Sequence, residues 1–188
     1  DEERIFGADE NIRNSSWTSR FMSPDGKADM AFRNAVLGLA VDHPFARRRV
    51  NAGRLSLPCS LEGSSLTIAD EDDFDVPMRP GVVCLDAPVK KDGGQDWLLR
   101  QLGTGFTLLI IGDAMANPQQ QLGDDLTIVR VGSGGPNDVQ DCEAKIEARY
   151  GKGVYLIRPD QHVAARWRQP DMGQVRAALN KVGQLVPA

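Results

Sequence analysis

Apolar residues recur at two different spacings along this chain, and the change of spacing divides it near residue 80. In the first part, apolar positions lie near helical spacing at Ala31, Val36, Leu39 and Ala40. This pattern predicts helices, and Ser23-Pro24-Asp25-Gly26 favours a turn between them. We therefore expect one helix over residues 1–22 and another over residues 28–50.

From Gly81 onward, short apolar runs of strand length alternate with stretches of helical spacing. The expected order is a strand, a helix (Gln95–Leu102), a strand (Phe106–Ile111), a short helix (Gln119–Leu122), a strand (Leu126–Val131), a helix (Val139–Tyr150), a hairpin and a last helix. Such an order predicts an α/β fold, a thioredoxin-like sandwich with a central mixed sheet and helices on both faces. The chain would then comprise a helical segment (1–50), a connector (51–80) and the α/β domain (81–188).

The stretch from Gly153 to Trp167 carries the strongest local pattern. Val154–Ile157 is a β-branched and aromatic run, which suits a strand covered on both faces. Arg158-Pro159-Asp160 then predicts a turn, in which the Asp160 carboxylate bonds the backbone just beyond it, and Val163–Trp167 resumes an extended pattern. A break at Gln169-Pro170-Asp171 supplies an N-cap for a terminal amphipathic helix that ends at Gly183.

These residues resemble a known family. Arg158-Pro159-Asp160, a residue pair and then Val163-Ala164-Ala165-Arg166-Trp167 resemble the carboxyl-terminal domain of FAD-dependent aromatic-ring monooxygenases of the phenol hydroxylase type. Upstream stretches resemble the same family in the same order, and together they cover most of residues 74–183: Pro80 to Pro88, Trp97-Leu98-Leu99 and Phe106-Thr107-Leu108-Leu109. The resemblance implies a thioredoxin-like domain without chemistry of its own, which serves structure or subunit association.

The beginning of the chain is also similar to this family. Glu3-Arg4 resembles the end of a helix in the flavin-binding domain, and Gly53-Arg54-Leu55-Ser56 with Ser64-Ser65-Leu66 resembles the stretch that joins the two domains. The resemblance implies that residues 1–50 are the tail of the flavin-binding domain, with Trp17 packing on its remainder. It also implies a fragment of a longer enzyme that uses FAD and NAD(P)H to hydroxylate a phenolic ring.

A member of this family that binds FAD would need a glycine-rich motif for the phosphates of the flavin. The glycine-rich stretches of this chain do not match that motif. Gly132-Ser133-Gly134-Gly135-Pro136 follows a predicted strand, but proline interrupts it and the third glycine is misplaced. Gly112-Asp113-Ala114 is similar to the family's flavin motif, yet it follows the central strand of the wrong domain. We therefore expect no catalytic, cofactor-binding or metal-binding residue in this chain, with FAD bound elsewhere in the full-length protein.

Thiol chemistry is the alternative function. A thioredoxin site needs two cysteines at Cys-x-x-Cys spacing on a helix N-terminus, whereas the corresponding stretch, Gly112 to Pro118, has no thiol. The three cysteines, Cys59, Cys84 and Cys142, are far apart in the sequence and suggest reduced thiols in a cytoplasmic protein. Cys84 is expected as a small buried side chain in a strand, and Cys142, early in a helix, would be the reactive thiol of a degenerate redox protein.

Charge argues against two classes of partner. The formal net charge of −4 and a pI near 5.2 disfavour nucleic acid, and no apolar run approaches the roughly 20 residues that span a bilayer. Arg47-Arg48-Arg49 would cap the carboxyl end of a helix. The acidic run Asp70–Asp75 does not have the glycine and terminal glutamate of a calcium loop, so it is predicted to be a solvated linker.

The histidines and tryptophans are expected to have structural roles rather than to form a metal or binding site. His43 and His162 are far apart and neither has a second ligand at metal spacing, and His162 is expected to be a solvated turn residue. Trp97 and Trp167 are expected in the core or in an interface. Three hypotheses stay open. In the first, the chain is a non-catalytic module of the aromatic hydroxylase, which contacts the flavin-binding domain of its own polypeptide and could form a homodimer. The second is a degenerate thiol protein, and the third is a free-standing interaction domain.

Overall fold

The structure is a computed structural model that describes residues 1–50, 58–115, 126–132, 135 and 138–183. The chain forms two compact units, Asp1–Cys59 and Ser60–Ala188, called unit 1 and unit 2 below. The expected short helix Gln119–Leu122 lies outside the described residues.

Unit 1 is helical, as the spacing of its apolar residues predicts. It contains α1 (Glu2–Met22), α2 (Lys27–Asp42) and α3 (Pro44–Val50). The single helix expected over residues 28–50 is wrong in one respect, because it ends at Asp42 and a second helix begins at Pro44. The residue before a proline is pushed out of the helical region, and His43 is accordingly extended, with φ −118° and ψ 117°.

The centre of unit 2 is a mixed four-stranded sheet. Its strands are β3 (Thr107–Ile111), β4 (Thr127–Val131), β6 (Gly153–Ile157) and β7 (Val163–Trp167), in the order β4-β3-β6-β7. The β3–β4 pair is parallel, whereas β3–β6 and β6–β7 are antiparallel. The expected strands Phe106–Ile111 and Leu126–Val131 and the expected hairpin are therefore confirmed.

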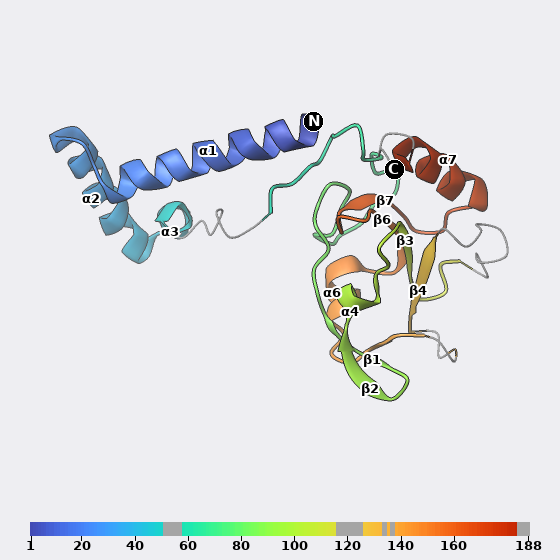
Figure 1. The fold of residues 1–188 in the computed structure, drawn as a ribbon. Coiled ribbons are helices and arrows are strands. Elements are labelled where there is room, and N and C mark those ends of the chain that lie inside the picture. The colour runs from blue at the N-terminus through green and yellow to red at the C-terminus, as the bar shows by residue number, and fades with distance from the viewer. Residues whose placement is uncertain (51–57, 116–125, 133–134, 136–137, 184–188) are drawn as a thin grey trace. The chain divides into compact units, whose positions relative to one another are not determined.

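Both faces of this sheet are buried, because side chains of successive strand residues point to opposite faces. One hydrophobic cluster contains Leu109, Ile111, Tyr155 and Ile157, together with Leu98, Ile146 and Tyr150 from α4 (Leu98–Gln101) and α6 (Lys145–Tyr150). The other contains Leu108, Ile110, Val154 and Leu156, together with Val175, Ala178 and Val182 from α7 (Met172–Gly183). Helices thus pack against both faces of a mixed sheet (Figure 1), which confirms the expected fold class.

The terminal helix begins where the sequence predicts. Asp171 Oδ1 accepts a hydrogen bond from the Gln174 amide at 2.8 Å, and Gln174 Oε1 accepts one from the Asp171 amide at 2.9 Å. This reciprocal pair is a capping box, which satisfies two backbone donors at the start of the helix.

A second, three-stranded sheet was not predicted. It has the order β2-β1-β5 and consists of β1 (Pro88–Lys91), β2 (Gly94–Trp97) and β5 (Gln140–Asp141). The helix expected over Gln95–Leu102 is therefore wrong in its first half, since only Leu98–Gln101 is helical. A two-residue turn, Asp92-Gly93, with φ of 50° and 78°, joins β1 to β2 and favours the hairpin over the helix.

Two further expectations are corrected. The helix predicted over Val139–Tyr150 is reduced to Lys145–Tyr150, because the Asp141 carboxylate accepts hydrogen bonds from the amides of Lys145, Ile146 and Glu147 and so starts the helix late. The strand expected after Gly81 is only an isolated bridge between Val83 and His162.

Candidate functional site

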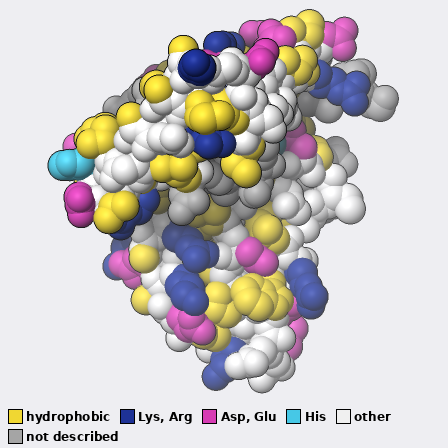
Figure 2. Space-filling view, turned by 90° about the vertical axis from the view of Figure 1, so that its left-hand side faces the viewer, with side chains coloured by type: hydrophobic (Ala, Val, Ile, Leu, Met, Phe, Trp, Pro, Cys, Tyr) yellow, Lys and Arg dark blue, Asp and Glu magenta, His cyan; other side chains and the backbone are white. Residues whose placement is uncertain are grey.

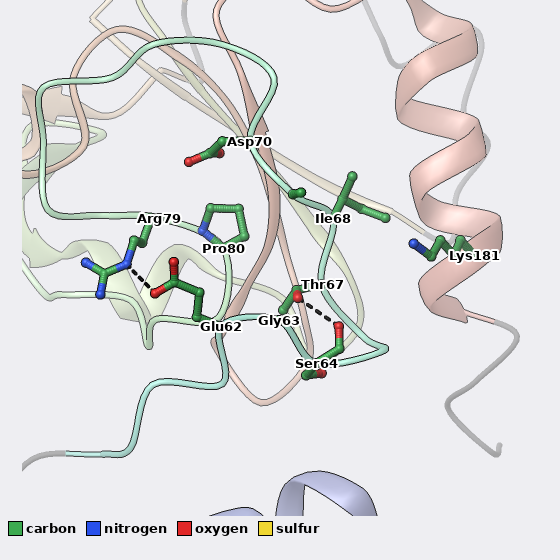
Figure 3. A pocket seen from close by; sticks show the side chains of 10 residues that line it. Glu62, Gly63, Ser64, Thr67, Ile68, Asp70, Arg79, Pro80 and Lys181 are labelled. Atoms are coloured by element: carbon green, nitrogen blue, oxygen red, sulfur yellow. Dashed lines mark hydrogen bonds and ion pairs between the residues drawn. The ribbon is translucent and has the colours of Figure 1, made fainter.

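A hollow on unit 2 lies between the connector and α7. It has a volume of about 530 Å³ and is lined by Glu62, Gly63, Ser64, Thr67, Ile68, Ala69, Asp70, Arg79, Pro80 and Lys181. Figure 3 shows that Glu62 and Arg79 lie together on one side of the hollow, while Lys181 reaches toward it from α7 on the other. Charged side chains of both signs and the apolar residues Ile68, Ala69 and Pro80 therefore line the same hollow.

Most polar groups of this hollow hydrogen-bond to one another. Arg79 Nε lies 2.8 Å from Glu62 Oε2, and Thr67 Oγ1 donates to the Ser64 carbonyl at 2.9 Å (Figure 3). Ser64 Oγ in turn accepts from the Leu66 amide at 2.9 Å. These bonds shape the connector itself.

The connector is fixed along the open edge of β7. The Ile68 amide donates to the Ala164 carbonyl at 2.8 Å, and the Gly81 amide donates to the Val163 carbonyl at 2.8 Å. The side chain of Arg166, only 5% exposed, makes a bidentate ion pair with Asp70, with 2.9 Å from Nε to Oδ1 and 2.6 Å from Nη2 to Oδ2. Its Nη1 also donates to the Met78 carbonyl. The connector thereby covers a sheet edge that would otherwise be free to pair.

An aromatic contact continues this arrangement. The guanidinium groups of Arg166 and Arg168 lie over the Phe74 ring, 4.3 Å and 4.1 Å from its centre, at distances typical of cation–π interaction. Asp72 Oδ2 accepts the Arg168 amide at 2.8 Å. The acidic residues of the run Asp70–Asp75 are all exposed, as the prediction of a solvated segment requires. Asp70 and Asp72 are in addition bound to β7 and to the residue after it, which the sequence did not predict.

The hairpin turn is held by its own charged side chains. Asp160 Oδ1 accepts the His162 amide at 3.2 Å, as predicted, and Asp160 Oδ2 lies 2.5 Å from Nη2 of the buried Arg158. Burial alone would raise the pKa of the Asp160 carboxyl, but the hydrogen bond from His162 and the charge of Arg158 together hold that pKa below its ordinary range. The His162 side chain is only 15% exposed, so it is not the solvated turn residue expected.

The three cysteines are free thiols in different surroundings. Cys84 is 4% exposed, and burial raises the pKa of its thiol to about 12, an effect that a hydrogen bond with Tyr150 offsets only in part. Its burial is confirmed, although it lies outside the named strands. Cys142 is exposed and precedes α6 rather than lying within it, which corrects the expected position. Cys84 is therefore held as a neutral thiol, the form that is neither nucleophile nor metal ligand.

One glycine of the stretch Gly132–Pro136 has an acidic partner. The Gly135 amide donates to the Asp138 carboxylate at 2.8 Å, so a negative charge already occupies the place an anion would need. Ser133, Gly134 and Pro136 lie outside the described residues. At the position of a thioredoxin site, the stretch after β3 is described as far as Met115, whose carbonyl accepts a hydrogen bond from Arg130 Nη1 at 3.0 Å.

The other candidate residues are dispersed. His43 belongs to unit 1 and His162 to unit 2, and within the described ranges no three His, Cys, Asp or Glu side chains form a group that could hold a metal ion. Arg47 donates to the carbonyls of Ala40 and Val41 near the carboxyl end of α2, as expected of a cap, although it does so from within α3 rather than from the end of the same helix. None of the helices in the described ranges has both the length and the apolar character needed to cross a bilayer.

The three tryptophans differ in exposure. Trp167 is 7% exposed and belongs to the core, as expected, whereas Trp97 is 46% exposed and lies outside it. Trp17 is 41% exposed, and its ring lies 6.1 Å from that of Phe32.

Comparison with solved structures shows the same fold in larger proteins. A ternary complex of aklavinone-11 hydroxylase with FAD and aklavinone is 22% identical, with a TM-score of 0.52 over 80% of this chain and 33% of that one. The rebeccamycin biosynthetic enzyme RebC with reduced flavin is 22% identical, with a TM-score of 0.55 over 96% of this chain and 34% of that one. For BexE the identity is 16% and the TM-score 0.54, over 87% of this chain and 30% of that one. The chain thus spans about a third of the length of these proteins.

Family membership rests on the sequence. No curated protein sequence matches the chain, but the model of the aromatic-ring hydroxylase C-terminal family matches residues 78–183. This range is more than half of the 188 residues, and it includes the four-stranded sheet, the hairpin and α7. The chain belongs to the aromatic-ring hydroxylase C-terminal family, as its sequence resemblance implied.

Proposed function

We propose that this chain is the C-terminal, non-catalytic module of an FAD- and NAD(P)H-dependent monooxygenase that hydroxylates aromatic, phenolic substrates. The family match over residues 78–183 carries this proposal. In the solved structures of similar fold, flavin is named as bound to proteins about three times as long as this chain. The role of unit 2 is to support structure and subunit association, and the flavin chemistry belongs to another part of the enzyme.

The side chains of unit 2 support a structural role. The sheet is filled on both faces by apolar side chains, and the connector occupies the edge of β7. The Cys84 thiol, one of the two candidates for redox chemistry, is buried and neutral. The Gly135 amide is bonded to a carboxylate rather than free for a phosphate. These features serve stability, and in the hollow between the connector and α7 the side chains of Glu62 and Arg79 are paired with each other.

The exposed hydrophobic side chains of unit 1 indicate that it binds a partner with a large apolar surface. α1 buries no residue and α2 buries only Val36, while large hydrophobic side chains lie exposed on these helices and on α3: Ile5, Phe6, Ile12, Trp17, Met22, Met30, Phe32, Leu37, Leu39, Val41, Phe45 and Val50. Hydrophobic side chains reach the surface in several patches (Figure 2). Exposed patches of this kind mark an interaction surface. We assign it to the flavin-binding domain of the same polypeptide, in a cytoplasmic enzyme whose cysteines stay reduced.

Flavin titration tests this function. The purified chain is mixed with FAD, and flavin fluorescence and absorbance are followed during gel filtration, with NADH and NADPH added in separate runs. The expected result is that flavin elutes apart from the protein and that neither nucleotide is oxidised. Stoichiometric, tight binding of FAD to this chain would contradict the proposal. Adding a flavin-binding domain of an aromatic hydroxylase as a second protein should then produce a complex through unit 1.

A further inference from the structure

The outer side of β2 is an open sheet edge. β2 is the end strand of the order β2-β1-β5 and pairs with β1 from Pro88↔Trp97 to Lys91↔Gly94. The two-residue turn makes Lys91 and Gly94 a hydrogen-bonded pair, and such pairs alternate with non-hydrogen-bonded pairs along an antiparallel ladder. Gln95, opposite Lys90, is therefore in a non-hydrogen-bonded pair, so its N–H and C=O point away from β1.

Gln95 presents both a backbone N–H and a backbone C=O on the outer side of β2. The Trp97 amide donates to Asp96 Oδ1 at 2.8 Å, and the Trp97 carbonyl accepts from Gln101 Nε2 at 3.5 Å. Among the residues that the structure describes, the Gln95 amide and carbonyl have no such partner. A donor and an acceptor on the same residue are self-complementary, because two antiparallel copies of Gln95 would exchange two hydrogen bonds.

We propose that two copies of this chain associate by antiparallel pairing of their β2 edges about a two-fold axis at Gln95. The inference rests on the subunit-association role proposed above and specifies its surface. A two-fold axis perpendicular to the sheet requires paired residues to share a face, so the axis passes midway between the two copies of one residue. At Gln95 it sets Asp96 opposite Gly94 of the second copy. At Asp96 it would set two carboxylates directly opposite each other, which is unfavourable.

Trp97 gives this edge an apolar anchor. In unit 2, the exposed large hydrophobic side chains of the described residues are Trp97, 46% exposed, and Leu85, 40% exposed. Asp86 Oδ1 accepts the amides of both Ala87 and Leu99, which holds the segments of these two residues together. In the proposed register Trp97 lies opposite Gly93 of the second copy. No heavy atom lies within 4 Å of a Cβ built on Gly93, so an indole ring has room there.

The position of the hairpin makes this pairing sterically accessible. Figure 1 shows the β1–β2 hairpin extending from unit 2 beyond the four-stranded sheet. Lys90, Lys91 and Gln95 are all exposed. An aromatic side chain over a cross-strand glycine is a known way to stabilise an edge, and tryptophan is enriched among residues that dominate binding energy. Pairing would join two three-stranded sheets into one continuous sheet.

Cysteine cross-linking tests the register. In a chain with Cys59→Ser and Cys142→Ser, Gln95→Cys is compared with Lys90→Cys on the neighbouring strand. Paired copies of residue 95 would have Cα atoms about 5.5 Å apart, within disulfide range, whereas residue 90 would be separated from its copy by about 14 Å. The expected result is a disulfide dimer that forms at least about tenfold faster with Gln95→Cys than with Lys90→Cys.

A second pair of variants separates the backbone from the side chain. Gln95→Pro removes the amide donor from the outer edge without disturbing the ladder to β1, and Gln95→Ala keeps the donor. In sedimentation of the full chain, Gln95→Pro should weaken self-association about tenfold, and Gln95→Ala should leave it unchanged. If the chain self-associates but neither assay distinguishes residue 95, the proposed pairing through β2 is wrong, while the proposed role in subunit association is retained. If the chain is monomeric at every concentration, both are overturned.

Discussion

Arg166 and Asp70 form a bidentate ion pair that joins β7 to the connector, although 96 residues separate them in the chain. The pair holds the connector on a sheet edge, and one of its members is nearly fully buried. A guanidinium forks onto a carboxylate with two parallel hydrogen bonds, which fixes orientation as well as distance. This contact therefore fixes both the position and the orientation of the connector at Asp70.

Removing the Asp70 carboxylate should destabilise the chain more than removing its acidic neighbours. Asp70→Ala leaves the Arg166 guanidinium buried beside a single carbonyl, and we expect a loss of about 3 kcal/mol in the free energy of unfolding. Asp75→Asn is the matched control, because Asp75 is exposed in the same acidic run, and it should change stability by less than about 0.5 kcal/mol. Urea denaturation followed by circular dichroism measures both. Equal effects of the two substitutions would show that the ion pair contributes nothing.

The free energy of unfolding should decrease at acidic pH, in part because the Asp160 carboxylate becomes protonated. Its folded-state pKa is lowered, so the stabilisation is fully present above the unfolded-state pKa of about 3.9 and is lost as the pH falls through the lower folded-state value. Asp160→Asn should be less stable than the parent chain at pH 7, and the difference should shrink below about pH 3. The measurement is the free energy of unfolding between pH 7 and pH 2. A difference that stays constant across this range would contradict the assignment.

Alkylation rates should separate the cysteines. Cys84 should react far more slowly than a free thiol at neutral pH, because its side chain is buried and its pKa is raised to about 12. Denaturant should restore ordinary reactivity. The exposed Cys142 serves as an internal control in the same chain, and Cys142→Ser identifies its signal. Peptide mapping after labelling with iodoacetamide measures each site. A cysteine that reacts faster than a free thiol near neutrality would revive the redox hypothesis.

A methyl group at Gly153 should disrupt the central hairpin. A Cβ built there would lie 2.6 Å from the Trp167 carbonyl oxygen and 3.2 Å from the Phe74 ring, so either β7 or the connector must move. Gly153→Ala should cost about 1–3 kcal/mol, the range for overpacking. Gly183→Ala is the control, since no heavy atom lies within 4 Å of its built Cβ. Thermal unfolding compares the two, and a Gly153→Ala chain as stable as the control would refute the predicted clash.

Much of unit 2 could be predicted because its signals are local. The β-branched and aromatic run of β6 suits a strand buried on both faces, and Asp171 with Gln174 forms a cap within four residues of chain. The β1–β2 hairpin had a local signal too, since Asp92-Gly93 is a strong turn dipeptide. The strands on either side of this turn are rich in polar residues, so they do not show the alternation of apolar and polar residues that usually flanks such a turn.

By itself, the sequence determined the family, the helical character of unit 1 and the strands of the central sheet, since each depends on neighbours a few residues away. Only the tertiary structure decided that the acidic run is bound to β7, that Trp97 lies outside the core and that β2 ends a second sheet. The physical reason is that an ion pair such as Asp70–Arg166 depends on which segments the fold brings together, and no spacing along the chain encodes that distance.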